Sequence, residues 1–247
     1  MMQNNNENFL HSAGIENAPL LECRNLCKSY GAVPVLYNWN ITITKGRVVG
    51  LLGPNGSGKT TLIKLINGLL TPTSGEVLIC GNSPGVESKK VISYLTDKDA
   101  LDSSMKVVDM INLYNDFFED FSEVRMYEML KRLDIHPETK IGTLSKGNRE
   151  KVRLILTMSR EAKLYVLDEP IGGVDPAARD YILDTIIKNY TPESSILLST
   201  HLISDVERIL DDVIFVSNGQ ITLAEAADNI RAQGKSVDQL FRETYRF

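Results

Sequence analysis

Hydrophobic residues fall into segments of two kinds, and the two kinds alternate along the chain. Short apolar-rich runs typical of buried strands occupy residues 48–52, 91–95, 164–167 and 195–200. Helical spacing follows the first run and returns over residues 105–133 and 143–158. Buried strands that alternate with helices predict an α/β fold built around parallel strands.

A second type of strand is predicted near the start of the chain. Apolar and polar positions alternate over residues 20–24 and 35–43, which favours half-buried strands. We expect these strands to form an antiparallel sheet beside the strand at 48–52. Residues 76–80 predict a further strand, which ends at a Gly-Asn pair.

A helical subdomain is predicted in the middle of the chain. Over residues 105–133 the apolar positions keep helical spacing with no strand between them, and Met, Phe and Tyr are frequent. We expect this subdomain to span about 97–160, to be inserted into the α/β core, and to have a small core of its own.

The last part of the chain predicts a hairpin and further helices. Residues 213–216 and 220–223 flank the turn Asn218-Gly219. Before them, Ser204-Asp-Val-Glu207 has the form of a capping box and predicts a helix that opens at Ser204. Residues 224–247 are predicted to be helical and contain no chemical motif.

A phosphate-binding loop is predicted between the strand at 48–52 and the helical segment after it. Its sequence is Gly53-Pro54-Asn55-Gly56-Ser57-Gly58-Lys59-Thr60-Thr61. Glycines let the backbone curl with its N–H groups inward, so that these groups and the helix N-terminus hold anionic phosphates. We expect Lys59 to reach the β- and γ-phosphates and the Thr60 hydroxyl to ligate Mg²⁺. A Gly-rich turn without a ligand is disfavoured, because the strand and helix contexts agree.

Acidic residues and a histidine follow two of the predicted strands. Asp168 and Glu169 come at the end of the run 164–167, and His201 comes directly after residue 200. The carboxyl ends of parallel strands are where α/β proteins bind ligands. Tyr30 precedes the phosphate loop, where its ring would stack on a base, although a half-buried strand-end tyrosine fits the spacing equally well.

Charge and composition narrow the class of protein. The 247 residues are 43% hydrophobic and 24% charged, as in ordinary globular domains. The net charge is −5 and the basic residues are scattered, which excludes a nucleic-acid surface as the main function. No apolar run reaches 18 residues and no secretory signal is visible, so a cytoplasmic location is expected. Residues 1–19 are rich in Asn and predict a disordered tail.

Five motifs along the chain resemble one family when they are taken together. They are the loop 53–61, the segment Leu144-Ser145-Lys146-Gly147-Asn148, the acidic strand end 164–169, the loop Gly172-Gly173-Val174-Asp175, and His201. In this order, residues 20–247 resemble the ATPase subunit of ATP-binding-cassette (ABC) transporters. The resemblance implies an α/β fold: a P-loop NTPase core with mixed sheet, an antiparallel β subdomain and an inserted α-helical subdomain.

The resemblance also implies partners. Two copies would face head to tail and hold two ATP molecules, each between the phosphate loop of one copy and Ser145 and Gly147 of the other. Asp175 would form part of this contact, although its position before Pro176 also suits a helix N-cap. We expect an ATP-dependent homodimer, with a heterodimer as the alternative, bound to an integral-membrane transporter subunit on the inner face of the cell membrane.

The candidate catalytic residues are Lys59, Glu169 and His201, and the candidate metal ligands are Thr60, Asp168 and Asp97. Phosphoryl transfer depends on positioning and charge stabilisation, which Lys59, Mg²⁺ and the loop amides would supply. Glu169 would take a proton from the attacking water, and His201 would hold the γ-phosphate and orient that water.

Two places depart from the family pattern. Asp97 stands where the family usually has Gln, in a loop that touches both Mg²⁺ and the membrane partner. Residues 144–148 correspond to the family's signature segment. In it, Lys146 stands where the family usually has Gly, and Asn148 where it has Gln. One hypothesis is that Lys146 of one copy offsets Asp97 of the other, and the alternative is that Lys146 points to water.

Three functions follow from the resemblance. The short chain, Lys146 and Asp97 resemble the ATPases of bacterial drug, antibiotic-peptide or small-ion exporters, and an importer stays open. The second possible function is that of a soluble ATPase resembling the iron–sulfur cluster assembly subunit. Co-purification with membranes would distinguish a transporter subunit from this soluble ATPase. Translation and DNA-repair ATPases fit poorly, since two cassettes or a long coiled coil are lacking. The transported substrate is chosen by the membrane partner.

Overall fold

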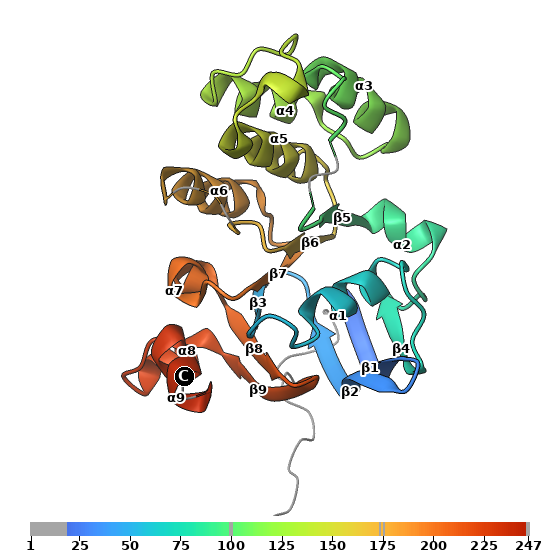
Figure 1. The fold of residues 1–247 in the computed structure, drawn as a ribbon, viewed down its shortest axis with the longest axis vertical. Helices are drawn as coiled ribbons and strands as arrows, with labels where there is room; N and C mark the ends of the chain where they lie inside the picture. The colour runs from blue at the N-terminus through green and yellow to red at the C-terminus, as the bar shows by residue number, and fades with distance from the viewer. Residues whose placement is uncertain (1–18, 99–100, 173, 175, 246–247) are drawn as a thin grey trace, which may run out of the picture.

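Two sheets and a group of helices make up the fold in the computed structural model, which describes residues 19–98, 101–172, 174 and 176–245 (Figure 1). The larger sheet has six strands in the order β5-β6-β7-β3-β8-β9. The strands are β5 (Ile92–Leu95), β6 (Leu164–Asp168), β7 (Ser195–Thr200), β3 (Val48–Leu52), β8 (Asp212–Ser217) and β9 (Gln220–Ala226). Neighbours from β5 to β8 are parallel and β9 is antiparallel to β8, which confirms the predicted mixed sheet.

Two hydrophobic cores cover the two faces of this sheet. Alternate residues of β3 enter them, Val49 and Leu51 on one face and Val48 and Leu52 on the other. The first core is shared with helix α1 (Lys59–Ile66) and the smaller sheet. The second core is shared with α5 (Lys146–Met158), α6 (Pro176–Asn189), α8 (Ala227–Ala232) and α9 (Val237–Tyr245). Burial on both faces explains why the parallel strands read as apolar runs in the sequence.

The smaller sheet is antiparallel, as predicted. Its order is β2 (Val33–Ile43), β1 (Leu21–Tyr30) and β4 (Ser74–Ile79). Strand β1 continues past the predicted end at residue 24. Its pairing with β2 shifts register after Cys23 but goes on to Tyr30, and the turn follows at Gly31. The Trp39 indole N–H donates to the Gly219 carbonyl at 2.7 Å, which joins this sheet to the β8–β9 hairpin.

The helical region lies at one end of the molecule (Figure 1) and contains α3 (Val107–Phe117), α4 (Glu123–Arg132) and α5. The continuous helical spacing over 105–133 is two helices. The chain between them is held by Asp120, which pairs with Arg160, and by Ser122, which caps α4 by accepting from Arg125 N. The predicted boundaries of the helical subdomain and of the domain at 20–247 stay predictions, and the tail at 1–18 lies outside the described residues.

Short elements differ from the sequence prediction. Helix α2 (Val86–Val91) and the 3-10 turn η1 (Ile141–Thr143) were not predicted, since they are too short for a periodic pattern, and the helix predicted after Ser204 ends in the 3-10 turn η2 (Glu207–Ile209). Residues 224–247 are not all helical, because β9 continues to Ala226 and Gly234, at φ +76°, separates α8 from α9. Within the described part of the chain, no helix is long and apolar enough to cross a bilayer.

The predicted capping box at Ser204 is wrong. The N-cap of helix α7 (Ile203–Val206) is Leu202, two residues before the predicted N-cap. The Leu202 N–H donates to the Thr200 hydroxyl at 3.0 Å, so the residue before His201 fixes the start of this helix. Ser204 instead lies within the helix and donates to the neighbouring Asp205.

Candidate active site

The predicted phosphate loop connects β3 to α1 and is packed too tightly for larger residues at two of its glycines. A Cβ at Gly53 would lie 2.3 Å from the Val216 carbonyl oxygen, and one at Gly58 would lie 2.6 Å from Leu36 Cδ2. Gly58 also has φ +109° and is the N-cap of α1. Because these positions are glycines, the loop backbone can pack closely at the N-terminus of α1. In this geometry the N–H groups of a loop and a helix N-terminus point toward a bound anion.

Lys59 is a buried cation at the first position of α1, with 5% of its surface exposed. Its Nζ donates to the carbonyl oxygens of Gly53 at 2.8 Å and Pro54 at 3.1 Å, and lies 3.7 Å from Glu169 Oε1. Burial lowers the pKa of Lys59, while the charges of Glu169 and Asp168 act in the opposite direction. The ammonium is therefore held inside the loop and faces the acidic strand end.

The ends of β6 and β7 bring together the predicted metal ligand Asp168, the predicted base Glu169 and His201. Ser199 Oγ donates to Asp168 Oδ1 at 2.5 Å, and the Thr200 hydroxyl donates to Glu169 Oε2 at 3.1 Å. His201 Nδ1 lies 3.0 Å from the same Glu169 oxygen. The parallel pairing of Asp168 with Ser199 produces this meeting, as expected for the carboxyl edge of a parallel sheet.

Glu169 has a left-handed backbone conformation, with φ +49°. Such a conformation costs roughly 1–2 kcal/mol for a residue other than glycine. Its N–H donates to the Ser199 carbonyl at 3.0 Å, which fixes the turn at the end of β6. The turn directs the carboxylate toward Lys59 and His201, so local strain is present where the candidate chemistry lies.

Two buried polar atoms beside the loop have no hydrogen-bond partner among the described residues, namely Ser57 Oγ and Asp168 Oδ2. Burial raises the pKa of Asp168, the hydrogen bond from Ser199 lowers it, and the charges of Asp97 and Glu169 raise it. A hydroxyl and a carboxylate oxygen of this kind fit a phosphate group and Mg²⁺, which prefers oxygen ligands. Among the described residues, no three His, Cys, Asp or Glu side chains form a metal site.

Asp97 lies at the same edge of the sheet. Leu95 of β5 pairs with Leu167 of β6, so the loop that carries Asp97 starts beside Asp168. The side chain of Asp97 is exposed. Its role as a metal ligand stays a prediction.

Ser145 and Gly147 lie at the start of α5 in the helical region, apart from the phosphate loop (Figure 1). Ser145 Oγ accepts from Asn148 N at 3.2 Å and caps the helix. Ser145 and Lys146 are exposed, so both are accessible to a second molecule. The predicted contact of Lys146 with another copy is untested, and Asp175 and Gly173 lie outside the described residues.

Tyr30 ends β1 and is 47% exposed, with Lys28 Nζ 5.5 Å from its ring centroid. The following strand packs its Leu36 against Gly58 of the loop. The tyrosine is therefore on the hairpin that touches the loop, and its stacking on a base stays a prediction. Thr61 lies within α1, one residue after Thr60.

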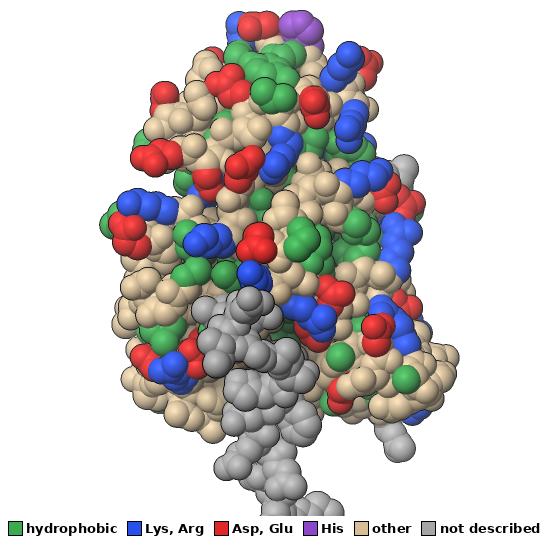
Figure 2. Space-filling view, turned by 180° about the vertical axis from the view of Figure 1, so that it is seen from behind, with side chains coloured by type: hydrophobic (Ala, Val, Ile, Leu, Met, Phe, Trp, Pro, Cys, Tyr) green, Lys and Arg blue, Asp and Glu red, His purple; other side chains and the backbone are tan. Residues whose placement is uncertain are grey.

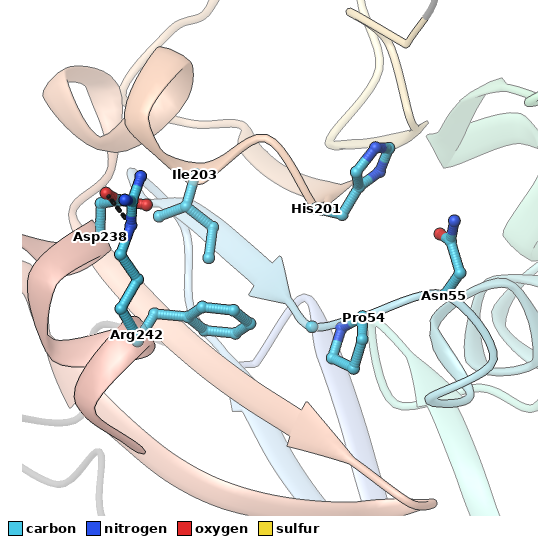
Figure 3. A pocket seen from close by; sticks show the side chains of 8 residues that line it. Pro54, Asn55, His201, Ile203, Asp238 and Arg242 are labelled. Atoms are coloured by element: carbon cyan, nitrogen blue, oxygen red, sulfur yellow. Dashed lines mark ion pairs between the residues drawn. The ribbon is translucent and has the colours of Figure 1, made fainter. Parts of the chain in front are cut away.

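A pocket of about 360 Å³ beside the loop was not predicted from the sequence (Figure 3). Its lining combines loop residues, the start of α7 and one side of α9: Gly53, Pro54, Asn55, His201, Ile203, Asp238, Phe241 and Arg242. Arg242 Nε pairs with Asp238 Oδ2 at 2.8 Å on the α9 side. Residues 224–247 contain no motif, so nothing in the sequence indicated that α9 would line the pocket.

Comparisons with known proteins give a consistent result. The family model described as ABC transporter matches residues 36–172, more than half of the chain. The chain is 28% identical to the lantibiotic transport ATP-binding protein SrtF of Streptococcus pyogenes, over 92% of this chain and 98% of that protein. It is 28% identical to the Nod factor export ATP-binding protein I of Cupriavidus metallidurans, over 81% and 69%. A structure described as the ATP binding subunit of an ABC transporter superposes with a TM-score of 0.81, at 30% identity over 91% of this chain and 98% of that one.

Proposed function

The chain belongs to the ABC transporter family, whose ATP-binding subunits are ATPases that work with membrane subunits, and we propose that it drives export through a separate integral-membrane protein. The names of the lantibiotic transport and Nod factor export relatives support transport over a soluble cluster-assembly ATPase, and the second name supports export. The observation that carries the proposal is the meeting of Lys59, Glu169 and His201 at the phosphate loop.

Binding of ATP is supported by the charge and shape of the loop. The buried Lys59 ammonium and backbone N–H groups of the loop would hold the phosphates, and Ser57 Oγ is free to donate to a phosphate oxygen. Thr60, Asp168 and Asp97 would hold Mg²⁺. When bound, Mg²⁺ neutralises charge that develops on the β- and γ-phosphate oxygens.

Glu169 is proposed as the base that takes a proton from the attacking water. Its carboxylate accepts from the Thr200 hydroxyl, and His201 Nδ1 lies 3.0–3.1 Å from both carboxylate oxygens. These contacts fix the direction of the carboxylate and of the imidazole. His201 would then orient the water against the γ-phosphate, and the proton would end on Glu169.

We propose an ATP-dependent homodimer in which Ser145 and Gly147 of each copy complete the site of the other, with a heterodimer as the alternative. The exposed start of α5 supports this arrangement. On the face shown in Figure 2, Lys and Arg side chains are interspersed with Asp and Glu, which supports a protein or membrane-protein partner over nucleic acid. The proposed location is peripheral, on the inner face of the cell membrane.

Light scattering on the Glu169→Gln variant tests this function. We expect Mg-ATP to convert the monomer into a dimer, because the variant retains the groups that bind ATP. A variant that also carries Lys59→Met is the control and should stay monomeric. If the Glu169→Gln chain binds ATP and stays monomeric, the homodimer is wrong and a second, different cassette must complete the site.

A further inference from the structure

Arg153 is a buried cation outside the groups discussed so far. It lies on α5 and 5% of its surface is exposed. Arginine is seldom buried without a partner, so its contacts identify what this side chain holds in place. One guanidinium nitrogen donates to Glu150 Oε2 at 2.5 Å, one turn earlier on the same helix. Another donates to the carbonyl oxygen of Thr96. The second contact leaves the helix and reaches the loop after β5.

Thr96 stands directly before Asp97, so Arg153 holds the backbone next to a candidate metal ligand. The Thr96 hydroxyl also accepts from Lys98 N at 2.9 Å, and this local turn encloses Asp97. The Leu95–Leu167 pair places Thr96 beside Asp168 where β5 and β6 end. A shift of the Thr96 carbonyl would therefore change the distance between the two aspartates.

The same helix carries the signature segment. Helix α5 begins at Lys146, and Arg153 lies two turns further along, on the side that meets the Asp97 loop. Through Arg153, the position of α5 and the position of Asp97 are tied to each other. Figure 1 shows α5 between the helices α3 and α4 on one side and β5 on the other, at the junction of the helical region with the sheet.

We infer that Arg153 is a positioning residue for the metal site: it sets the place of Asp97 relative to Asp168 and makes that place depend on helix α5. This inference rests on the proposed function, because it requires Mg²⁺ to bind with ATP at these aspartates. Residues that orient metal ligands in this way typically affect metal affinity by about 10–100-fold.

Arg160 provides a matched control on the same segment. Its side chain is 4% exposed, and it also binds one carboxylate, that of Asp120, together with backbone carbonyls. One of these is the carbonyl of Ile92, at 2.5 Å, at the opposite end of β5 from Asp97. Loss of Arg160 should therefore disturb the helical region without moving the metal ligands.

The test measures Mn²⁺ affinity by electron paramagnetic resonance in the presence of saturating ATP, on the full chain with Glu169→Gln to prevent turnover. Arg153→Met should weaken Mn²⁺ binding by roughly 10-fold and leave ATP affinity in EDTA within twofold. Arg153→Lys should recover part of the loss, because one ammonium can reach the Thr96 carbonyl. Arg160→Met should lower the melting temperature but leave Mn²⁺ affinity within twofold.

A double-mutant cycle decides whether Arg153 acts through Asp97. Asp97→Asn should weaken Mn²⁺ binding less in the Arg153→Met background than in the parent, because Asp97 is already displaced there. Additive effects, an unchanged Mn²⁺ affinity in Arg153→Met, or an equal loss in Arg160→Met would overturn the inference while the proposed function stands. If Arg153→Met does not fold, Arg153→Lys carries the same comparison. A parent chain that binds ATP but no Mn²⁺ overturns both.

Discussion

The ammonium of Lys59 lies 3.7 Å from Oε1 of Glu169, across the gap between the phosphate loop and the end of β6. His201 Nδ1 approaches the same carboxylate from β7, at 3.0–3.1 Å. Both Lys59 and Glu169 are largely removed from solvent, so the charges interact more strongly than they would at the surface. The charges of Lys59, the proposed phosphate ligand, and Glu169, the proposed base, are therefore coupled. A substitution at either residue changes the electrostatic environment of the other.

Glu169→Gln is expected to reduce ATP turnover by about 10²–10⁴-fold, because an amide cannot accept the proton of the attacking water. ATP affinity should stay within a few-fold, since Lys59 and the loop backbone are retained. Turnover is measured by phosphate release and affinity by equilibrium dialysis. The control is Glu193→Gln, an exposed glutamate that pairs with Lys45 outside the site. Turnover above one tenth of the parent rate would show that Glu169 is not the base.

Asp168→Asn is expected to stabilise the chain at pH 7 in the absence of nucleotide and Mg²⁺. Burial raises the pKa of Asp168 in the folded protein, so the folded state binds this proton more tightly than the unfolded state. The resulting stability is present below the unfolded pKa, about 3.9, and is lost as pH rises through the folded value. At pH 7 the buried carboxylate is therefore unfavourable, and an amide removes that cost.

Thermal unfolding measures this effect, and each kcal/mol corresponds to about 2–4 °C for a chain of this size. The gain of Asp168→Asn should shrink as the pH falls from 7 toward about 4. Asp228→Asn is the control, because Asp228 is 89% exposed and its loss should change stability by less than about 0.5 kcal/mol. A lower melting temperature for Asp168→Asn at pH 7 would contradict the expected sign.

Gly219→Ala is expected to destabilise the protein by about 2–4 kcal/mol, because it combines a positive φ with overpacking. Gly219 has φ +74°, and its Cβ would lie 2.3 Å from the Val35 carbonyl oxygen and 2.8 Å from the Tyr37 ring. Gly234→Ala is the matched control, since φ is +76° and the space is open. It should cost only about 1 kcal/mol. Equal urea midpoints for the two variants would mean that the contact between the sheets is not tight.

The sequence predicted the elements whose signals are local. The apolar run at 48–52, the glycines of the loop and the acidic pair after β6 each carry their own pattern, so β3, the loop and the Asp168–Glu169 edge were placed correctly. The antiparallel sheet was also predicted from alternation. Periodicity indicates which face of a helix or strand is buried but not which element packs against it. The differences between the predicted and the observed elements arise for this reason.

The features that the sequence did not predict depend on tertiary contacts. The break between α3 and α4 is fixed by the Arg160–Asp120 pair, whose members are 40 residues apart. The start of α7 is fixed by the Thr200 hydroxyl, which binds Leu202 N and overrides the capping pattern at Ser204. Helix α9 lines the pocket beside the loop, although its residues are far from the loop in the sequence. Only the folded structure shows that they are neighbours.

Phe241→Ala tests whether α9 supports the phosphate loop. The Phe241 ring is buried, contacts the Phe215 ring edge-on at 5.2 Å between centroids, and lines the same pocket as Pro54. Its removal is expected to cost about 3–5 kcal/mol in urea unfolding. ATP affinity should also fall several-fold, because the pocket wall beside the loop loses its support.

Phe117→Ala is the control for this last prediction. Phe117 is a phenylalanine of α3 that is largely exposed, so its loss should change stability by less than about 0.5 kcal/mol. ATP affinity of this variant should equal that of the parent chain. If Phe241→Ala is destabilised but binds ATP with unchanged affinity at a temperature where it is fully folded, α9 contributes to stability alone. The pocket then does not transmit changes in α9 to the phosphate loop.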